Sequence, residues 1–202
     1  LDRVRDSLSV QNWTNEVQLI VVDNASTFNA FDELCPLVSR LPCEVLWLRN
    51  KANYQALGSL YASAQLIDTP WLTFMHQDDS YFSNFVSAII REIRKVGESL
   101  ETMSISFDYM SVREGGTPSH SANPTWFAQS GPPHKVFLQN IANHALPWPS
   151  TAFRTEYLLS KRVPFHSSAF PDTEIALLQA SSGKFTYVPE VVMAYHEEIS
   201  SG

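Results

Sequence analysis

Residues 17–23 read VQLIVVD, a nearly continuous apolar run that ends at Asp23. A strand that is covered on both faces of a sheet has this pattern, because none of its side chains has to face water. Residues 43–50 (CEVLWLRN) and 71–79 (WLTFMHQDD) repeat the pattern, and both end in polar residues. The three runs predict strands of a mainly parallel central sheet.

Segments with apolar residues at helical spacing separate and follow these strands. Gly97 is a natural stop for one of them, whereas Pro36 must limit or kink another. A further strand is expected over residues 185–196, interrupted at Pro189. The alternation predicts an α/β fold in which helices flank the sheet. The expected helices cover residues 1–13, 28–40, 53–67, 82–97, 150–160 and 172–183.

The composition is that of one globular domain over residues 1–202, with 44% hydrophobic residues. A net charge of -7, with 14 scattered Lys and Arg residues, argues against a nucleic-acid partner. Cys35 and Cys43 are expected to be buried thiols in a reducing compartment. No apolar stretch approaches the roughly 20 residues that cross a bilayer. We expect a cytoplasmic protein, with contact to a membrane surface left open.

Polar residues follow the predicted strands, at Asp23, at Arg49 and at the pair Asp78 and Asp79. In open α/β sheets, ligands bind outside the carboxyl ends of the strands. With only 7 glycines, the chain has neither G-x-G-x-x-G nor the P-loop pattern. A dinucleotide enzyme and a P-loop kinase are therefore disfavoured.

The adjacent carboxylates of Asp78 and Asp79 raise an electrostatic problem. Two like charges about 4 Å apart repel by roughly 4 kcal/mol at an effective dielectric near 20. A divalent cation removes the repulsion, and Mg²⁺ binds one or two carboxylates together with substrate phosphate oxygens. The alternative is that one aspartate turns the chain and caps a helix that starts near Ser80 or Ser83. The spacing alone leaves both interpretations open.

Three segments together resemble the family 2 glycosyltransferases, which have the GT-A fold. They are residues 17–27 (VQLIVVDNAST), residues 53–79, which end in HQDD, and residues 170–196, which begin FPDTEIALL. The resemblance implies inverting transfer of a sugar from a nucleotide-diphosphate donor to a hydroxyl of a glycan or lipid-linked acceptor. It also implies Mg²⁺ or Mn²⁺ as cofactor, and a role in cell-surface polysaccharide or glycoconjugate synthesis at the inner face of the membrane.

The resemblance also implies roles for single residues. Asp23 contacts the donor nucleotide, and Asp78 and Asp79 bind the metal and the donor diphosphate. Asp172 is the catalytic base that accepts the proton of the acceptor hydroxyl. Glu174 is the alternative base, in which case Asp172 only caps its helix.

His196 matches the family less well. It stands where a side chain can reach the metal or the diphosphate, and a packing role is the alternative. The region 113–150 begins as a long loop rich in Gly, Pro, Ser and Asn. Loops of that length are usually functional or mobile, so we assign it to the acceptor side, where Trp126 and Trp148 would offer aromatic faces to sugar rings or simply anchor the loop.

The sequence also departs from the family pattern. It lacks the opening strand and its Pro-Thr-Tyr-Asn-like turn, so we expect an N-terminally truncated domain with a gap in its sheet. His76 replaces the first aspartate of D-x-D-D, and Pro171 replaces an acidic residue. We expect His76 to support the aspartates rather than to bind the metal. A metal-dependent glycosyltransferase is the leading interpretation, and these departures make an alternative plausible, a catalytically silent relative that binds sugar nucleotides or glycans.

A phosphatase of the haloacid dehalogenase type is the third interpretation. It would need an early D-x-D-x-[TV] segment, and the stretch VVDNAST lacks the second aspartate.

Overall fold

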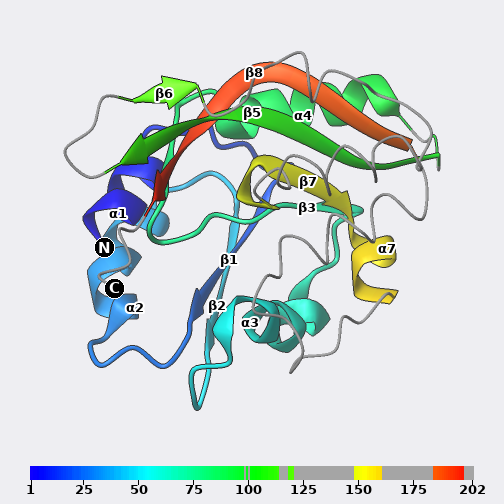
Figure 1. Cartoon of the computed structure of the whole chain (residues 1–202). Coiled ribbons are helices and arrows are strands. Elements are labelled where there is room, and N and C mark those ends of the chain that lie inside the picture. Colours follow the sequence, from blue (N-terminus) through cyan, green and yellow to red (C-terminus); the bar gives the residue numbers. More distant parts are fainter. Residues whose placement is uncertain (98, 100, 114–117, 121–147, 161–183, 198–202) are drawn as a thin grey trace.

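The computed structural model describes residues 1–97, 99, 101–113, 118–120, 148–160 and 184–197 (Figure 1). These residues form helices and two sheets, which confirms the expected α/β class. Within them, no helix combines the length and the apolar character needed to cross a membrane. Cys35 is a half-buried free thiol, and Cys43 is a buried one.

The smaller sheet contains the first two predicted strands. β1 (Gln18–Asp23) pairs in parallel with β2 (Glu44–Arg49), and their register ends with Asp23 opposite Arg49. The other residues of β1 are only half-buried, because the described sheet at this point has two strands. The parallel pairing nevertheless brings both polar strand ends to the same edge.

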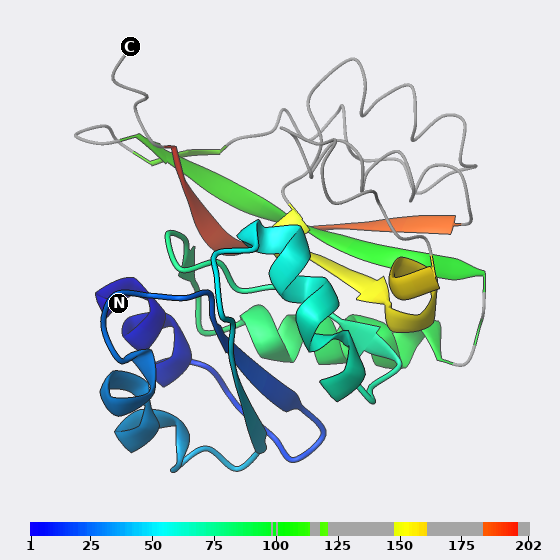
Figure 2. The ribbon, with the colours of Figure 1, turned by 90° about the horizontal axis from the view of Figure 1, so that it is seen from below.

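Helices connect these strands as expected. α2 (Ala30–Val38) runs from β1 to β2 and contains Pro36 close to its end. α3 (Gln55–Ser63) follows β2 and continues into the short 3₁₀ helix η1 (Ala64–Leu66). Figure 2 shows α2 and α3 on different sides of the β1–β2 ribbon.

The larger sheet is mixed, so the expectation of a mainly parallel sheet is imprecise. Its strand order is β3-β7-β5-β8-β4, with β6 added beside β5, and the β5–β8 pair alone is parallel among the described pairs. β6 has to be antiparallel, because residues 114–118 are too few for a parallel crossover. The strands are β3 (Trp71–Leu72), β4 (Ser80–Tyr81), β5 (Thr102–Arg113), β6 (Ser119–His120), β7 (Thr151–Arg154) and β8 (Lys184–Glu197).

Two sequence predictions are wrong in part. The third strand was expected over residues 71–79 but ends at Leu72, because the chain then turns and Thr73 donates its hydroxyl to the Thr151 carbonyl, 3.0 Å away. Residues 150–160 were expected to be helical, but they begin as β7 and become α7 (Thr155–Ser160) only in their second half. Pairing with β3 on one side and β5 on the other overrides the helical pattern there.

The irregularity predicted at Pro189 is confirmed. Phe107 pairs with Val188 and Asp108 pairs with Val191, so β8 bulges across Pro189 while the strand continues. A proline cannot donate a ladder hydrogen bond, and a bulge accommodates it.

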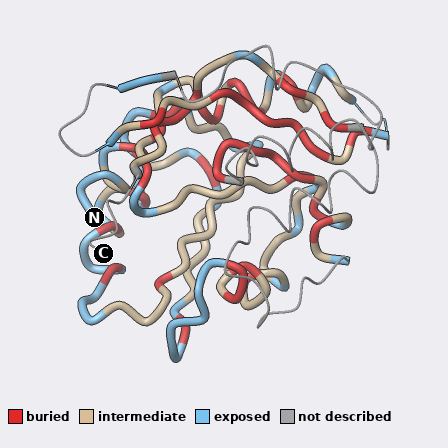
Figure 3. The backbone as a smooth tube through the Cα atoms, viewed as in Figure 1, coloured by how far each residue is buried: buried red, intermediate tan, exposed pale blue. Residues whose placement is uncertain are grey.

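The core lies between the larger sheet and α4 (Phe85–Val96), which Figures 1 and 2 show along one face of β5 and β8. Figure 3 shows that burial is concentrated in the middle of β5 and along most of β7. Gly97 ends α4 with a φ of 59°, a conformation that favours glycine, and confirms the predicted stop. The core side chains include Phe85, Ala88, Ile89, Ile105, Phe107, Val192 and Met193.

The β1–β2 pair and the larger sheet are separate sheets within the described residues. The missing first strand and the N-terminal truncation that we expected stay predictions.

Candidate metal and donor site

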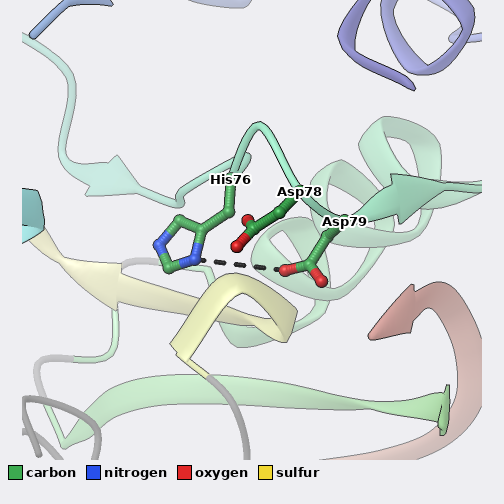
Figure 4. Close-up of side chains that lie close together, drawn as sticks. All are labelled: His76, Asp78 and Asp79. Carbon is green, nitrogen blue, oxygen red and sulfur yellow. Dashed lines mark ion pairs between the residues drawn. The ribbon is translucent and has the colours of Figure 1, made fainter. Parts of the chain in front are cut away.

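A tight turn between β3 and β4 brings three potential metal ligands together. One donor atom from each of His76, Asp78 and Asp79 lies within 4.8 Å of the others. Figure 4 shows the three side chains converging, with His76 Nδ1 4.0 Å from Asp79 Oδ2. Asp78 is exposed and His76 half-buried, whereas Asp79 is 1% exposed. The turn therefore presents one carboxylate to solvent and holds the second below it.

The helix α1 (Asp2–Ser9) fixes this turn from one side. Arg3 Nη1 donates a hydrogen bond to the Asp78 carbonyl at 2.6 Å. One turn further along the helix, Ser7 Oγ accepts the Tyr81 N–H at 3.0 Å. Residues spaced by four share one helix face, so one face of α1 binds the backbone at Asp78 and, just after the aspartate pair, at Tyr81.

Gln11 continues this face beyond the end of α1. Its amide nitrogen donates to the Phe82 carbonyl at 2.9 Å and to the Ser7 carbonyl at 2.9 Å. Its amide oxygen accepts the Val86 N–H, 3.2 Å away, in the first turn of α4. One buried side chain thus joins α1, the chain after the aspartates and α4. Sequence reasoning missed this role, although the spacing of Arg3, Ser7 and Gln11 was a visible signal.

His196 meets the aspartates through its backbone. The pairing of β4 with β8 aligns Ser80 with Ala194, and the His196 N–H donates to Asp79 Oδ1 at 3.2 Å. The imidazole Nε2 of His196 lies 3.0 Å from Ser80 Oγ. Burial lowers the pKa of His196, and the Arg3 charge lowers it further, while Asp78 opposes both.. The role of its side chain at the metal stays a prediction.

Burial also controls protonation inside the turn. It lowers the pKa of His76 to about 4, against the opposing charge of Asp78, so the imidazole is neutral at neutral pH. Burial, and then the charge of Asp79, raises the pKa of Tyr81 well above its usual value. The Tyr81 hydroxyl therefore stays protonated, and it accepts the His76 N–H at 2.7 Å.

Asp23 lies in a second cluster, at the ends of β1 and β2. Its Oδ1 accepts the Ser26 N–H at 2.8 Å, and Arg49 Nε lies 3.4 Å from its Oδ2. Burial raises the pKa of Asp23, but the Ser26 hydrogen bonds and the Arg49 charge outweigh it, and the pKa is lowered overall. Arg49 also donates to the Ser26 carbonyl at 3.1 Å, which closes the loop after β1.

Asparagine side chains surround this loop. Asn50 donates to Asn24 Oδ1 at 3.0 Å and to Ser59 Oγ at 3.1 Å, and Asn24 donates to Asn53 Oδ1 at 2.7 Å. The Tyr54 N–H donates to Asn24 Oδ1 at 2.9 Å. Sequence analysis placed Asp23 and Arg49 at strand ends but gave a ligand role to Asp23 alone, because the hydrogen bonds of this network join residues from two separate strand ends.

The remaining predicted residues fall outside the described parts of the chain. These are Asp172, Glu174 and Trp126, and most of the region 113–150. Trp148 starts the short 3₁₀ helix η2 (Trp148–Ser150), next to β7. The base and the acceptor side stay predictions.

The donor set of the turn suits a divalent cation. Carboxylate oxygens are ligands of Mg²⁺ and Mn²⁺, and a neutral imidazole nitrogen is a ligand of transition-metal ions. His76, Asp78 and Asp79 supply both kinds within one turn. The residues present therefore fit the expected cofactor.

Residues 1–159 match the family described as Glycosyl transferase family 2. The chain belongs to this family. No curated protein matches the sequence.

Solved structures resemble the family 2 chain in fold. TarS of S. aureus, residues 1–349, aligns with a TM-score of 0.70 and 15% identity, over 94% of this chain and 54% of TarS. TarS 1–349 in complex with UDP-GlcNAc aligns with a TM-score of 0.70 and 13% identity, over 96% of this chain and 54% of that one. Mannosyltransferase PcManGT from Pyrobaculum calidifontis, in complex with GDP-Man and Mn²⁺, aligns with a TM-score of 0.66 and 12% identity. The alignment covers 99% of this chain and 53% of PcManGT. The chain thus spans about half the length of these solved chains and 33% of a longer TarS structure, and the likeness confirms the GT-A fold.

Proposed function

We propose that this family 2 chain transfers a sugar, with inversion, from a nucleotide-diphosphate sugar to a hydroxyl of a glycan or lipid-linked acceptor. The observation that carries the proposal is the convergence of His76, Asp78 and Asp79 in a turn fixed by α1. The reaction would use Mg²⁺ or Mn²⁺ and serve cell-surface polysaccharide or glycoconjugate synthesis, in the cytoplasm at the inner face of the membrane.

The donor class is supported by the related folds. TarS was solved with UDP and with UDP-GlcNAc, and PcManGT with GDP-Man and Mn²⁺. In this chain, the loop held by Asp23 and Arg49 lies at the carboxyl ends of parallel strands, where ligands of α/β sheets bind. We assign the nucleotide to this loop and the diphosphate to the aspartate turn.

The residues divide the chemical work. Exposed Asp78 is the carboxylate that meets the donor side of the cation. The carboxylate of Asp79 is buried beneath Asp78 and is held in place by the hydrogen bond that it accepts from the His196 N–H. A divalent cation bound by these carboxylates supplies the positive charge that stabilises the leaving diphosphate. Asp172, or Glu174 in its place, accepts the proton of the acceptor hydroxyl as it attacks the anomeric carbon.

Thermal unfolding against a panel of nucleotide sugars, with and without Mn²⁺, tests the proposal. A donor that binds the folded chain raises its melting temperature by mass action, and we expect this to require the metal. Asp79→Asn should remove the metal-dependent shift and the turnover, whereas Asp68→Asn, at an exposed position outside the turn, should leave both intact.

The same experiment separates the enzyme from the silent relative. Metal-dependent donor binding without turnover on any acceptor or water would favour the silent relative, to which the departures at His76 and Pro171 point. Failure of every donor to stabilise the chain would count against the enzyme and against a relative that binds sugar nucleotides, and would leave the glycan-binding relative.

A further inference from the structure

The imidazole of His76 is placed to share a cation with both carboxylates of the turn, because one donor atom from each of the three residues lies within 4.8 Å of the others. Its Nδ1 lies 4.0 Å from Asp79 Oδ2, which is too long for a hydrogen bond. Atoms bound to one cation at about 2.0–2.2 Å lie about 3 to 3.5 Å apart, so a small contraction of this triad would close it around an ion. Figure 4 shows the ring turned toward both carboxylates.

The backbone of His76 is held in that position. Its N–H donates to the Tyr81 hydroxyl at 2.7 Å, and the Tyr81 N–H in turn donates to Ser7 Oγ. Tyr81 is 3% exposed and packs edge-on against Phe85 at a ring-centroid distance of 4.7 Å. The backbone of His76 is therefore anchored to a buried side chain, which limits the movement of its ring. A metal ligand requires this kind of preorganisation.

We propose that His76 is the third protein ligand of the cation bound by Asp78 and Asp79, and that its nitrogen tilts the site toward Mn²⁺ and Co²⁺ over Mg²⁺. Imidazole suits transition-metal ions, whereas Mg²⁺ takes oxygen ligands in a strict octahedral arrangement. The proposal rests on the proposed function for the identity of the site, and it replaces our expectation that His76 only supports the aspartates.

Pulsed electron paramagnetic resonance of the Mn²⁺-loaded protein tests the nitrogen directly. A histidine ligand gives a ¹⁴N coupling, which we expect in the wild type and in His196→Asn but not in His76→Gln or His76→Asp. His196→Asn is the matched control, because His196 is the other described histidine beside the aspartates. Loss of the coupling in His196→Asn with retention in His76→Gln would overturn the proposal, as would a wild type that binds no Mn²⁺.

Calorimetric titration with Co²⁺ and with Mg²⁺ tests the selectivity. His76→Asp makes the donor set all-oxygen, so the ratio of the two dissociation constants should move toward Mg²⁺ by at least about tenfold. An unchanged ratio, with circular dichroism showing that the variant folds, would contradict the proposal. Nucleotide-sugar binding with Mn²⁺ but no ¹⁴N coupling would sink this inference alone, whereas ¹⁴N-coupled Mn²⁺ without any donor binding would sink the proposed function alone.

Discussion

Asp23 and Asp78 both lie next to strand ends, yet their surroundings are opposite. The Asp23 side chain is 6% exposed, accepts the Ser26 N–H and faces the Arg49 guanidinium. Asp78 is exposed, and in the described part of the chain no lysine or arginine forms an ion pair with its carboxylate. Arg3 approaches it but donates to the backbone carbonyl.

The contrast distinguishes two uses of a carboxylate next to a strand end. A carboxylate that is neutralised by a cation of the protein itself stabilises the fold, and this interaction is already present before any ligand binds. Two adjacent carboxylates left without such a partner repel each other until a cation arrives from outside. By this criterion Asp23 shapes the loop after β1, and Asp78 is the residue of the turn that we propose binds the cation.

The largest expected effect is that of Asp78→Asn. Loss of a metal ligand should lower glycosyl transfer by about 10²–10⁴-fold, because the metal's charge stabilisation in the transition state is worth several kcal/mol. Removal of a charge beside Asp79 should not lower the melting temperature of the metal-free protein. Turnover assays with Mn²⁺ and thermal unfolding in a chelator measure the two effects.

Asp68→Asn is the control for charge loss at an exposed site, and it should change neither quantity. An Asp78→Asn variant that keeps full turnover, or that unfolds at a lower temperature without metal, would erase the distinction from Asp23.

The second largest expected effect concerns the side chain of Gln11, which holds the chain after the two aspartates in place. Gln11→Ala removes the amide that joins α1, Phe82 and Val86, and leaves buried backbone groups unsatisfied. We expect it to lower the free energy of unfolding by about 1–3 kcal/mol in urea titration, and to weaken Mn²⁺ binding at the turn. The exposed Gln65→Ala should cost less than about 0.5 kcal/mol. Equal effects of the two variants would show that α1 does not brace the turn.

Glu92 is a third carboxylate for this comparison, and like Asp23 it is paired with cations of the protein itself. Its side chain is 9% exposed and lies 2.9 Å from Arg91 Nε and 2.8 Å from Lys95 Nζ. Burial raises the pKa of Glu92, but hydrogen bonds from Lys95 and Arg91 outweigh it and lower the pKa overall.

A lowered folded-state pKa stabilises the protein above the unfolded value, near 4.3, and this stabilisation is lost as the pH falls through the folded-state pKa. We expect Glu92→Gln to cost about 1 kcal/mol at pH 7 and to flatten the fall of stability below pH 5 or so. Urea unfolding at pH 7, 5 and 4 measures both. A variant with the wild-type acid slope would show that Glu92 does not contribute in this way.

The sequence predicted the elements that local pattern determines. The strands β1 and β2, the stop at Gly97 and the bulge at Pro189 were predictable from apolar runs and from glycine and proline chemistry. β5 was not singled out, because serines at 104, 106 and 111 interrupt its apolar pattern. Those serines are buried where β5 pairs with β7 and β8, which is non-local information.

The site was predictable in composition but not in geometry. The adjacent aspartates left a metal site and a helix cap open until the family resemblance favoured the metal, and spacing could not show that Asp79 is buried and Asp78 exposed. His76 was set aside as a supporting residue, because only the fold of the turn shows that its ring faces the carboxylates. The Arg49 partner of Asp23 depends on the register between β1 and β2, which no single strand encodes.

The smallest expected effect tests the internal neutralisation of Asp23. Arg49 is 55% exposed, so Arg49→Met should lower the free energy of unfolding by no more than about 1 kcal/mol. Its clearer consequence is a rise in the pKa of Asp23, because the Arg49 charge is one of the causes that lower it. Carboxyl titration by NMR measures this rise, and Lys51→Met, which removes an exposed cation two residues along, is the matched control. If both variants leave the pKa of Asp23 unchanged, Ser26 alone holds the carboxylate ionised, and the contrast with Asp78 rests on hydrogen bonding instead of on charge.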